Sequence, residues 1–202
     1  MYTPKLYREE DRVKIIEFLR QNEFATVATY DGEKPIASHL LVEVFEDGEK
    51  LFINGHMSRA NPLWKTIEMN SEVLVIFQGP HTYISPTWYN HVNVPTWNYQ
   101  AAHVYGKPRI VEDYDEAYQI LKRLTDRHEA ASQYKLETLP QGFVEKEIKG
   151  IVAFQIEVTR IEANYKLSQN RNDEDYQNII AKLEEREDEM SRGVADAMRK
   201  QR

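Results

Sequence analysis

The first residues that could do chemistry form the run from Asn54 to Pro62, which reads Asn-Gly-His-Met-Ser-Arg-Ala-Asn-Pro and joins an expected strand to an expected helix. Glycine lets a backbone approach a ligand closely, and Ser58 and Arg59 carry hydroxyl and guanidinium donors. A helix N-terminus adds free N–H groups. These features together favour a phosphate cradle. A polar turn in front of a capped helix explains the same residues, and both interpretations stay open.

Two further groups of residues are candidates for a site. Ser38-His39 interrupts a strand that is otherwise apolar, and such a pair either lines a site or faces solvent on the pleat. A belt of aromatic residues can stack on a planar ring, anchor a subunit interface, or simply pack in the core. The belt consists of Tyr83, Trp88, Tyr89, Trp97, Tyr99 and Tyr105.

Composition excludes several classes of protein. The 202 residues include no cysteine, so disulfide scaffolds, thiolate metal sites, iron–sulfur clusters and cysteine nucleophiles are ruled out. The histidines do not follow a metal-binding spacing, and no G-x-S-x-G, G-x-G-x-x-G or P-loop pattern occurs. We therefore predict no metal site and name no catalytic residue.

Charge and hydropathy bear on partners and location. The net charge of −7 argues against a broad nucleic-acid surface, and the only small basic cluster is at the end of the chain, at Arg192, Arg199, Lys200 and Arg202. Every apolar stretch is too short to span a bilayer, and the N-terminus lacks the apolar region of a secretory signal. We expect a cytoplasmic protein that does not bind membranes.

The elements that must position these residues follow from periodicity. Strands are predicted at 24–30, 35–45 and 51–54, and the Asp31-Gly32 and Asp47-Gly48 turns make an antiparallel meander of them. The apolar run 73–77 predicts a strand buried on both faces. Further strands are expected at 83–85, 97–111 and 151–158, with a long loop at 86–96.

Helices are predicted at both ends of the chain and between the strands. A helix is predicted at residues 9–21, with Val13 in its apolar stripe, and a short helix is predicted after Asn61-Pro62. A helix at 113–128 has Asp113 as its cap. The tail from Asp173 onward is helical and charged, and residues 184–189 are expected to be a solvated helix face.

Five segments in order along the chain resemble the PaiB family. They are FATVAT at 24–29, GHMSRANP at 55–62, FQGPHTYISP at 77–86, VPTWNY at 94–99 and KLSQNR at 166–171. The resemblance implies an α+β fold that is mainly β: a split β-barrel of the FMN-binding type, with peripheral helices and a C-terminal helical tail. It also implies relatives among pyridoxamine-phosphate oxidases and flavin reductases. We expect a barrel domain at 1–165 and a helical extension at 166–202, which packs on the barrel or on a dimer partner.

The resemblance further implies a homodimer with FMN in a groove at its interface. It implies that His56, Ser58 and Arg59 bind the phosphate, and that Ser38, His39 and Leu40 support the isoalloxazine ring. Asn54 and Gln78 are expected to bond the polar edge of the ring, and the partner's Trp97 to cover it. The residues expected to close the groove are Lys166, Ser168 and Gln169.

The function that the resemblance implies is negative regulation of sporulation and of the production of degradative enzymes such as proteases. No residues match the substrate-binding set of an oxidase, so the resemblance leaves enzymatic activity open. The alternatives are a flavin-dependent oxidoreductase and a haem-binding split-barrel protein. Direct DNA binding is a further possibility, which the acidic charge disfavours.

Overall fold

The computed structural model describes residues 1–202, and the chain divides into two compact units. Unit 1 comprises Met1–Phe18, Gln78–His103 and Glu162–Arg202, and unit 2 comprises Leu19–Phe77 and Val104–Ile161. The strands are β1 (Arg8–Glu9), β2 (Phe24–Tyr30), β3 (Pro35–Asp47), β4 (Lys50–Ser58), β5 (Val73–Ile84), β6 (Thr96–Val111) and β7 (Ile151–Lys166). The α-helices are α1 (Arg12–Gln21), α2 (Leu63–Ile67), α3 (Tyr114–His128), α4 (Gln141–Lys149), α5 (Asp173–Glu184) and α6 (Glu189–Gln201).

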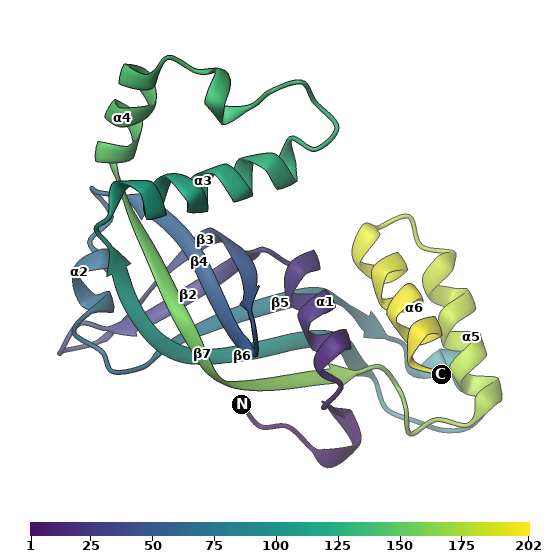
Figure 1. The fold of residues 1–202 in the computed structure, drawn as a ribbon. Helices are drawn as coiled ribbons and strands as arrows, with labels where there is room; N and C mark the ends of the chain where they lie inside the picture. The colour runs from purple at the N-terminus through teal and green to yellow at the C-terminus, as the bar shows by residue number, and fades with distance from the viewer. The chain divides into compact units, whose positions relative to one another are not determined.

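The sheet has the strand order β1-β7-β4-β3-β2-β5-β6, and a further pairing between β6 and β7 closes it into a barrel (Figure 1). The meander predicted for unit 2 is confirmed. Strands β2 and β3 are antiparallel from Phe24–Leu41 to Tyr30–Pro35, and β3 continues with β4 from Val42–Gly55 to Asp47–Lys50. The two Asp-Gly turns close these hairpins because Gly32 and Gly48 take positive φ angles, at +100° and +60°.

Strands β5 and β7 differ in length or burial from their predicted form. Strand β5 runs unbroken to Ile84, so residues 83–85 are not a separate strand. Within residues 73–77 of β5, Val73, Val75 and Phe77 are buried while the residues between them are half-buried. The prediction that both faces of this run are buried is therefore wrong. Strand β7 extends eight residues beyond the predicted 158, to Lys166.

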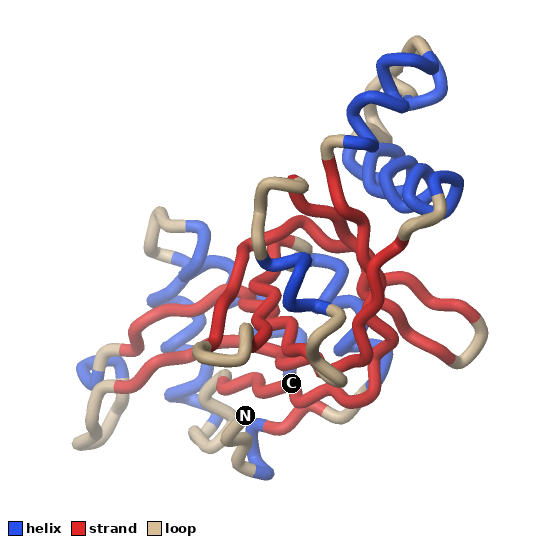
Figure 2. Tube along the Cα trace, turned by 90° about the vertical axis from the view of Figure 1, so that its left-hand side faces the viewer, coloured by secondary structure: helices blue, strands red, loops and turns tan.

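Helices α3 and α4 form an excursion of unit 2 between strands β6 and β7 (Figure 2). It begins where β6 ends and ends where β7 begins. The predicted cap is confirmed, since the Oδ1 atom of Asp113 accepts a hydrogen bond of 2.8 Å from the Glu116 N–H. The excursion has its own apolar cluster. It joins α3, α4 and the adjoining strand ends through Val111, Ala117, Ile120, Leu124, Val144, Ile148 and Ala153. Helix α4 is absent from the sequence prediction.

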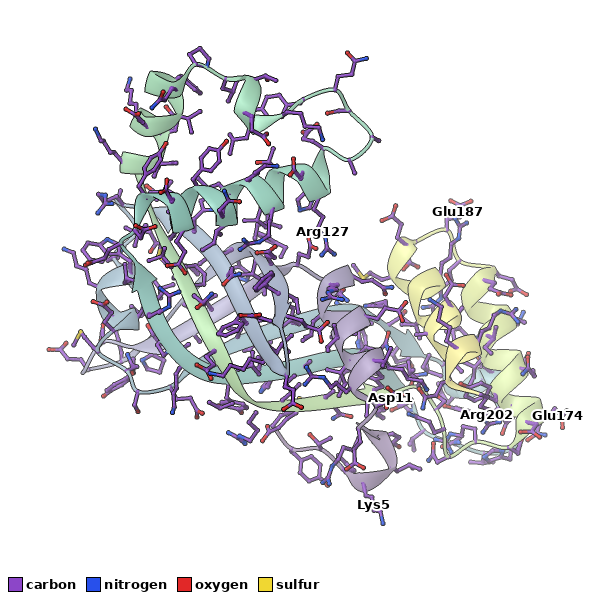
Figure 3. The ribbon with its side chains drawn as sticks, viewed as in Figure 1. Lys5, Asp11, Arg127, Glu174, Glu187 and Arg202 are labelled. Carbon is purple, nitrogen blue, oxygen red and sulfur yellow. The ribbon has the colours of Figure 1, made fainter.

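In unit 1, α5 and α6 form an antiparallel hairpin, and Glu187 lies in the turn between them (Figure 3). The expectation of one solvated helix face at 184–189 is therefore wrong, because α5 ends at Glu184 and α6 begins at Glu189. At the N-terminal end, Val13 of α1 is 74% exposed, and so it does not belong to the apolar stripe predicted there. None of the helices combines the length and the apolar character that crossing a membrane requires.

Candidate functional site

The predicted site residues fall into two groups, one in each unit. Unit 2 contains those of strands β3 and β4 and the loop that follows β4, and unit 1 contains the rest. The members in unit 2 are Ser38, His39, Leu40, Asn54, His56, Ser58 and Arg59. The members in unit 1 are Gln78, Trp97, Lys166, Ser168 and Gln169.

The three consecutive residues of β3 do not share a face of the sheet. Side chains alternate along a strand, so Ser38 and Leu40 point to the same side as the buried Val42, while His39 points to the other. The His39 ring stacks at 5.9 Å on the ring of Phe24, and both side chains are exposed. The Ser38 hydroxyl instead accepts a hydrogen bond of 3.0 Å from Asn61, which ties β3 to the loop after β4.

His56 is the member of the β4 set that has an unused polar atom. The Nδ1 atom of its ring is buried and has no hydrogen-bond partner in the chain. Burial lowers the pKa of His56 below its ordinary value, so the imidazole is neutral at pH 7. His56 is opposite Ala153 of β7, which places it on the face of the sheet that α3 and α4 cover.

Asn54 is on the same face as His56, but both ends of its amide are used inside the chain. Its Nδ2 atom donates to Glu43 at 3.1 Å, and its Oδ1 atom accepts from Gln155 at 3.0 Å. Glu43 in turn accepts two hydrogen bonds from Nε of Arg123 on α3, at 2.8 and 3.0 Å. This buried network fastens α3 to the sheet, and the sequence pattern gave no sign of it. The role expected for Asn54 at a flavin edge stays a prediction.

Gly55 is needed for packing inside unit 2. A Cβ atom built at Gly55 would lie 2.6 Å from Cζ of Phe154, closer than carbon atoms approach one another. The space beside this glycine is therefore filled by the Phe154 ring of β7, and Phe154 is fully buried.

Arg59 is exposed but not free. Its Nε and Nη2 atoms donate to the carbonyl oxygens of Lys149 and Ile151, at 2.9 and 2.8 Å, and its backbone N–H donates to Gly150 at 2.9 Å. These three bonds hold the turn between α4 and β7. The Nη1 group is the part of the guanidinium without a partner in the chain.

The backbone donors of the loop after β4 are also used. The Ala60 N–H donates to the Ser58 hydroxyl oxygen at 3.2 Å and the Asn61 N–H to the Ser58 carbonyl at 2.9 Å. The Leu63 N–H donates to the Asn61 side chain at 3.0 Å. The helix that follows, α2, has only five residues. The free N–H groups expected of a phosphate cradle are thus engaged by the loop itself.

In unit 1, Trp97 is 47% exposed and stacks on His81 at 5.8 Å, with Tyr83 edge-on at 6.4 Å. Gln78 is exposed, at the start of the unit 1 part of β5. Trp97 and Tyr83 are the exposed members of the predicted belt, whereas Tyr89 is buried.

The remaining predicted residues of unit 1 lie at the end of β7 and just after it. Lys166 donates to Thr96 at 2.5 Å, and Gln169 bonds the Tyr165 carbonyl. Ser168 is buried, takes a left-handed φ of 61°, and accepts a hydrogen bond of 2.9 Å from Asn98. Ser168 is the only non-glycine residue of the chain with a positive φ, so its conformation is imposed by the surrounding contacts.

The histidines and carboxylates form no group of three or more that could hold a metal ion.

Comparisons with known proteins bear on this arrangement. Residues 1–160 match the model of a family described as "Putative FMN-binding domain". A Bacillus subtilis protein named "Protease synthase and sporulation protein PAI 2" is 42% identical to the chain over 200 residues, which are 98% of this chain and 96% of that protein.

The chain belongs to the family described as "Putative FMN-binding domain". The resemblance to the PaiB family is therefore confirmed over the whole chain.

Solved structures with the same fold are more distant in sequence. The FAD and haem binding protein of Mycobacterium smegmatis has a TM-score of 0.62 at 16% identity, covering 85% of this chain and 79% of that one. The flavocytochrome Anf3 of Azotobacter vinelandii has a TM-score of 0.59 at 15% identity, covering 85% and 75%. These likenesses confirm the split-barrel fold predicted for this PaiB-family chain. The expected boundary between residues 165 and 166 stays a prediction.

Proposed function

We propose that this PaiB-family chain binds FMN and acts as a homodimeric regulator of sporulation and of degradative enzyme production. The observation that carries the proposal is the family match over residues 1–160, which includes all of β3, β4 and the loop after β4. The regulatory part is supported by the 42% identity to the Bacillus subtilis sporulation protein along nearly the whole chain.

The residues of unit 2 fit a flavin on the face of β3 and β4 that carries His39 and His56. The buried Nδ1 of His56 needs a hydrogen-bond partner, and a neutral imidazole can donate to, or accept from, a flavin heteroatom. The exposed Phe24–His39 ring pair offers a planar surface for the isoalloxazine. FMN bound there would supply redox chemistry that no side chain of this cysteine-free sequence can supply.

The phosphate of FMN would lie near the loop after β4. There the Ser58 hydroxyl can donate a hydrogen bond, and the Nη1 group of Arg59 is free. Because the other guanidinium donors and the backbone N–H groups of this loop are engaged, we expect phosphate to add only modestly to flavin affinity at this position.

FMN and riboflavin titrations, followed by flavin fluorescence, test the proposal. Wild-type protein should bind both, and His56→Leu should weaken both at least about tenfold, the loss of one buried hydrogen bond. His128→Asn is the matched control, because His128 is exposed on α3 of the same unit and pairs with Glu23. Wild-type protein that binds neither flavin would disprove the flavin part of the proposal. Unchanged binding by His56→Leu would disprove the position of the site.

The regulatory role is proposed to work without direct DNA contact. Two of the basic residues near the end of the chain are paired with acids, Arg199 with Glu184 at 2.7 Å and Arg202 with Asp173 at 2.6 Å. Such pairing removes positive charge that a DNA backbone would need. Fluorescence anisotropy with labelled promoter fragments should show no salt-dependent binding, and tight binding that weakens steeply with salt would refute this mechanism.

The dimer is tested separately. Sedimentation of the purified chain should give twice the monomer mass of 23.8 kDa. A monomer at all accessible concentrations would refute a site shared by two subunits.

A further inference from the structure

Two positive side chains of unit 1 have no acidic partner. Lys166 ends β7, and its ammonium group donates to the hydroxyl of Thr96 at 2.5 Å. Arg171 follows in the loop that leads to α5, and its guanidinium carbon lies 4.7 Å from the ring centre of Tyr89. Neither side chain takes part in an ion pair.

Two buried polar atoms of the stacked Arg171–Tyr89 pair have no hydrogen-bond partner in the chain. They are Nε of Arg171 and the hydroxyl of Tyr89, and Tyr89 is only 8% exposed. Buried polar groups are almost always hydrogen-bonded in folded proteins, so two orphans on one stacked pair require an explanation. An arginine Nε can only donate, and a lysine ammonium can only donate. The cluster is rich in donors and poor in acceptors.

The loop between the two cations forms a tight turn, in which the Arg171 N–H donates to the Ser168 carbonyl oxygen at 3.0 Å. Burial lowers the pKa of Lys166, and the charge of Arg171 lowers it further. A bound anion would remove this repulsion by interacting with both groups.

The carboxylate of Asp175, which follows Arg171 closely in the sequence, is occupied by other groups. Asp175 is buried at the start of α5 and accepts hydrogen bonds from the Asn90 N–H at 2.8 Å and from the Asn172 side chain at 2.9 Å. Its second oxygen also lies 3.2 Å from Nδ1 of His91. The carboxylate is therefore occupied by the loop around residue 90.

The loop that presents the cations is held in one conformation. Ser168 has the left-handed backbone described above, and its hydroxyl is fixed by Asn98. The side chain of Gln169 accepts a hydrogen bond of 2.7 Å from the Leu167 N–H and donates to the Tyr165 carbonyl. Such prior ordering lowers the entropy lost when a ligand binds.

We propose that Lys166, Arg171 and Tyr89 form a binding site in unit 1 for a compact oxyanion, of the class of a phosphate group. The ammonium, the guanidinium Nε–H and the phenol hydroxyl each donate to an oxygen of the anion. This site uses none of the unit 2 residues near His56, and it does not depend on flavin binding.

Inorganic phosphate is the probe. It is titrated into the full chain in a phosphate-free, low-salt buffer, and binding is followed by calorimetry or by ³¹P line broadening. Arg171→Gln and Lys166→Gln should each weaken phosphate binding at least about tenfold, since each removes a charge-assisted hydrogen bond. Tyr89→Phe, which removes one hydroxyl, should weaken it less and serves if either charge variant fails to fold.

Arg199→Gln is the matched control. Arg199 is also in unit 1, on α6, but its guanidinium is paired with Glu184 at 2.7 Å and its side-chain hydrogen bonds go only to that carboxylate. Loss of this side chain should leave the phosphate affinity within about twofold of wild type, a smaller change than the loss of one hydrogen bond would cause. Wild-type protein that does not bind phosphate overturns the proposal. Equal binding by wild type and all three site variants overturns it too.

A second arm identifies the source of the anion. If Arg171→Gln weakens FMN but not riboflavin, the site holds the flavin phosphate. If it weakens inorganic phosphate but neither flavin, the site holds a different ligand. Both results support the anion site. Because inorganic phosphate is read without flavin, failure of flavin binding does not affect this test.

Discussion

Replacing Arg59 tests whether this residue acts mainly by holding the turn between α4 and β7. Its two side-chain hydrogen bonds reach the carbonyls of Lys149 and Ile151. Hydrogen bonds that involve a charged group contribute about 1.5–3 kcal/mol each when shielded, and less in water. Since Arg59 is exposed, we expect Arg59→Ala to lower the free energy of unfolding by about 2 kcal/mol in total.

For a chain of this size, 1 kcal/mol corresponds to about 2–4 °C in Tm, so Arg59→Ala should lower Tm by about 4–8 °C. Arg59→Lys keeps the charge but cannot donate to both carbonyls in one planar geometry, and it should lose about half as much. Differential scanning calorimetry measures both variants.

Arg8→Ala is the control for this experiment. Arg8 is half exposed and makes only a loose pair of 3.6 Å with Glu10, so its Tm should stay within about 1 °C of wild type. If Arg59→Ala unfolds at the wild-type temperature, the turn does not depend on Arg59 and the reasoning is refuted. If the lysine variant matches wild type while the alanine variant does not, charge rather than geometry is what matters.

Three other changes have defined outcomes. Gly55→Ala should lower the free energy of unfolding by about 1–3 kcal/mol in urea denaturation, because its Cβ meets the Phe154 ring, and an unchanged midpoint would contradict this. Glu43→Gln removes the charge that faces Arg123 and should cost about 2–3 kcal/mol, less than a fully buried pair, with proteolysis between α3 and α4 becoming faster. Burial lowers the pKa of Lys166 in the folded chain below its ordinary value of 10.5. Between these two pKa values the unfolded chain binds more protons than the folded chain, so the free energy of unfolding rises with pH in this range. Lys166→Met should therefore be at least as stable as wild type at pH 7, with the advantage shrinking toward pH 10 in denaturant titrations, and a growing advantage would show that the sign is wrong.

Local sequence signals predicted the parts of the fold that local physics decides. Strand β2 was predicted with its observed bounds because β-branched and aromatic residues end at an Asp-Gly turn. The cap at Asp113 was equally readable. Helix α4 was not predicted, because only Val144 and Ile148 of its nine residues are buried and the apolar stripe is too thin to detect.

The candidate site was predictable only in part, because its residues are used by partners far away in the sequence. The acceptors of Arg59 lie 90 and 92 residues further along the chain. The sequence run that contains Lys166 also contains Arg171, but nothing in the run shows that Arg171 stacks on Tyr89. Contacts between residues this far apart in the sequence form when the barrel closes, and a short stretch of sequence does not predict them.

The exposed connection between α3 and α4 gives the protein a practical handle. Residues 130–135 are exposed, and the natural chain has no cysteine, so Ala131→Cys would create a unique thiol at an accessible position. A single fluorophore attached there would label a homogeneous protein without removal of any native residue of the two candidate sites. Its emission could report changes in the surroundings of this helical excursion while flavin or phosphate is added.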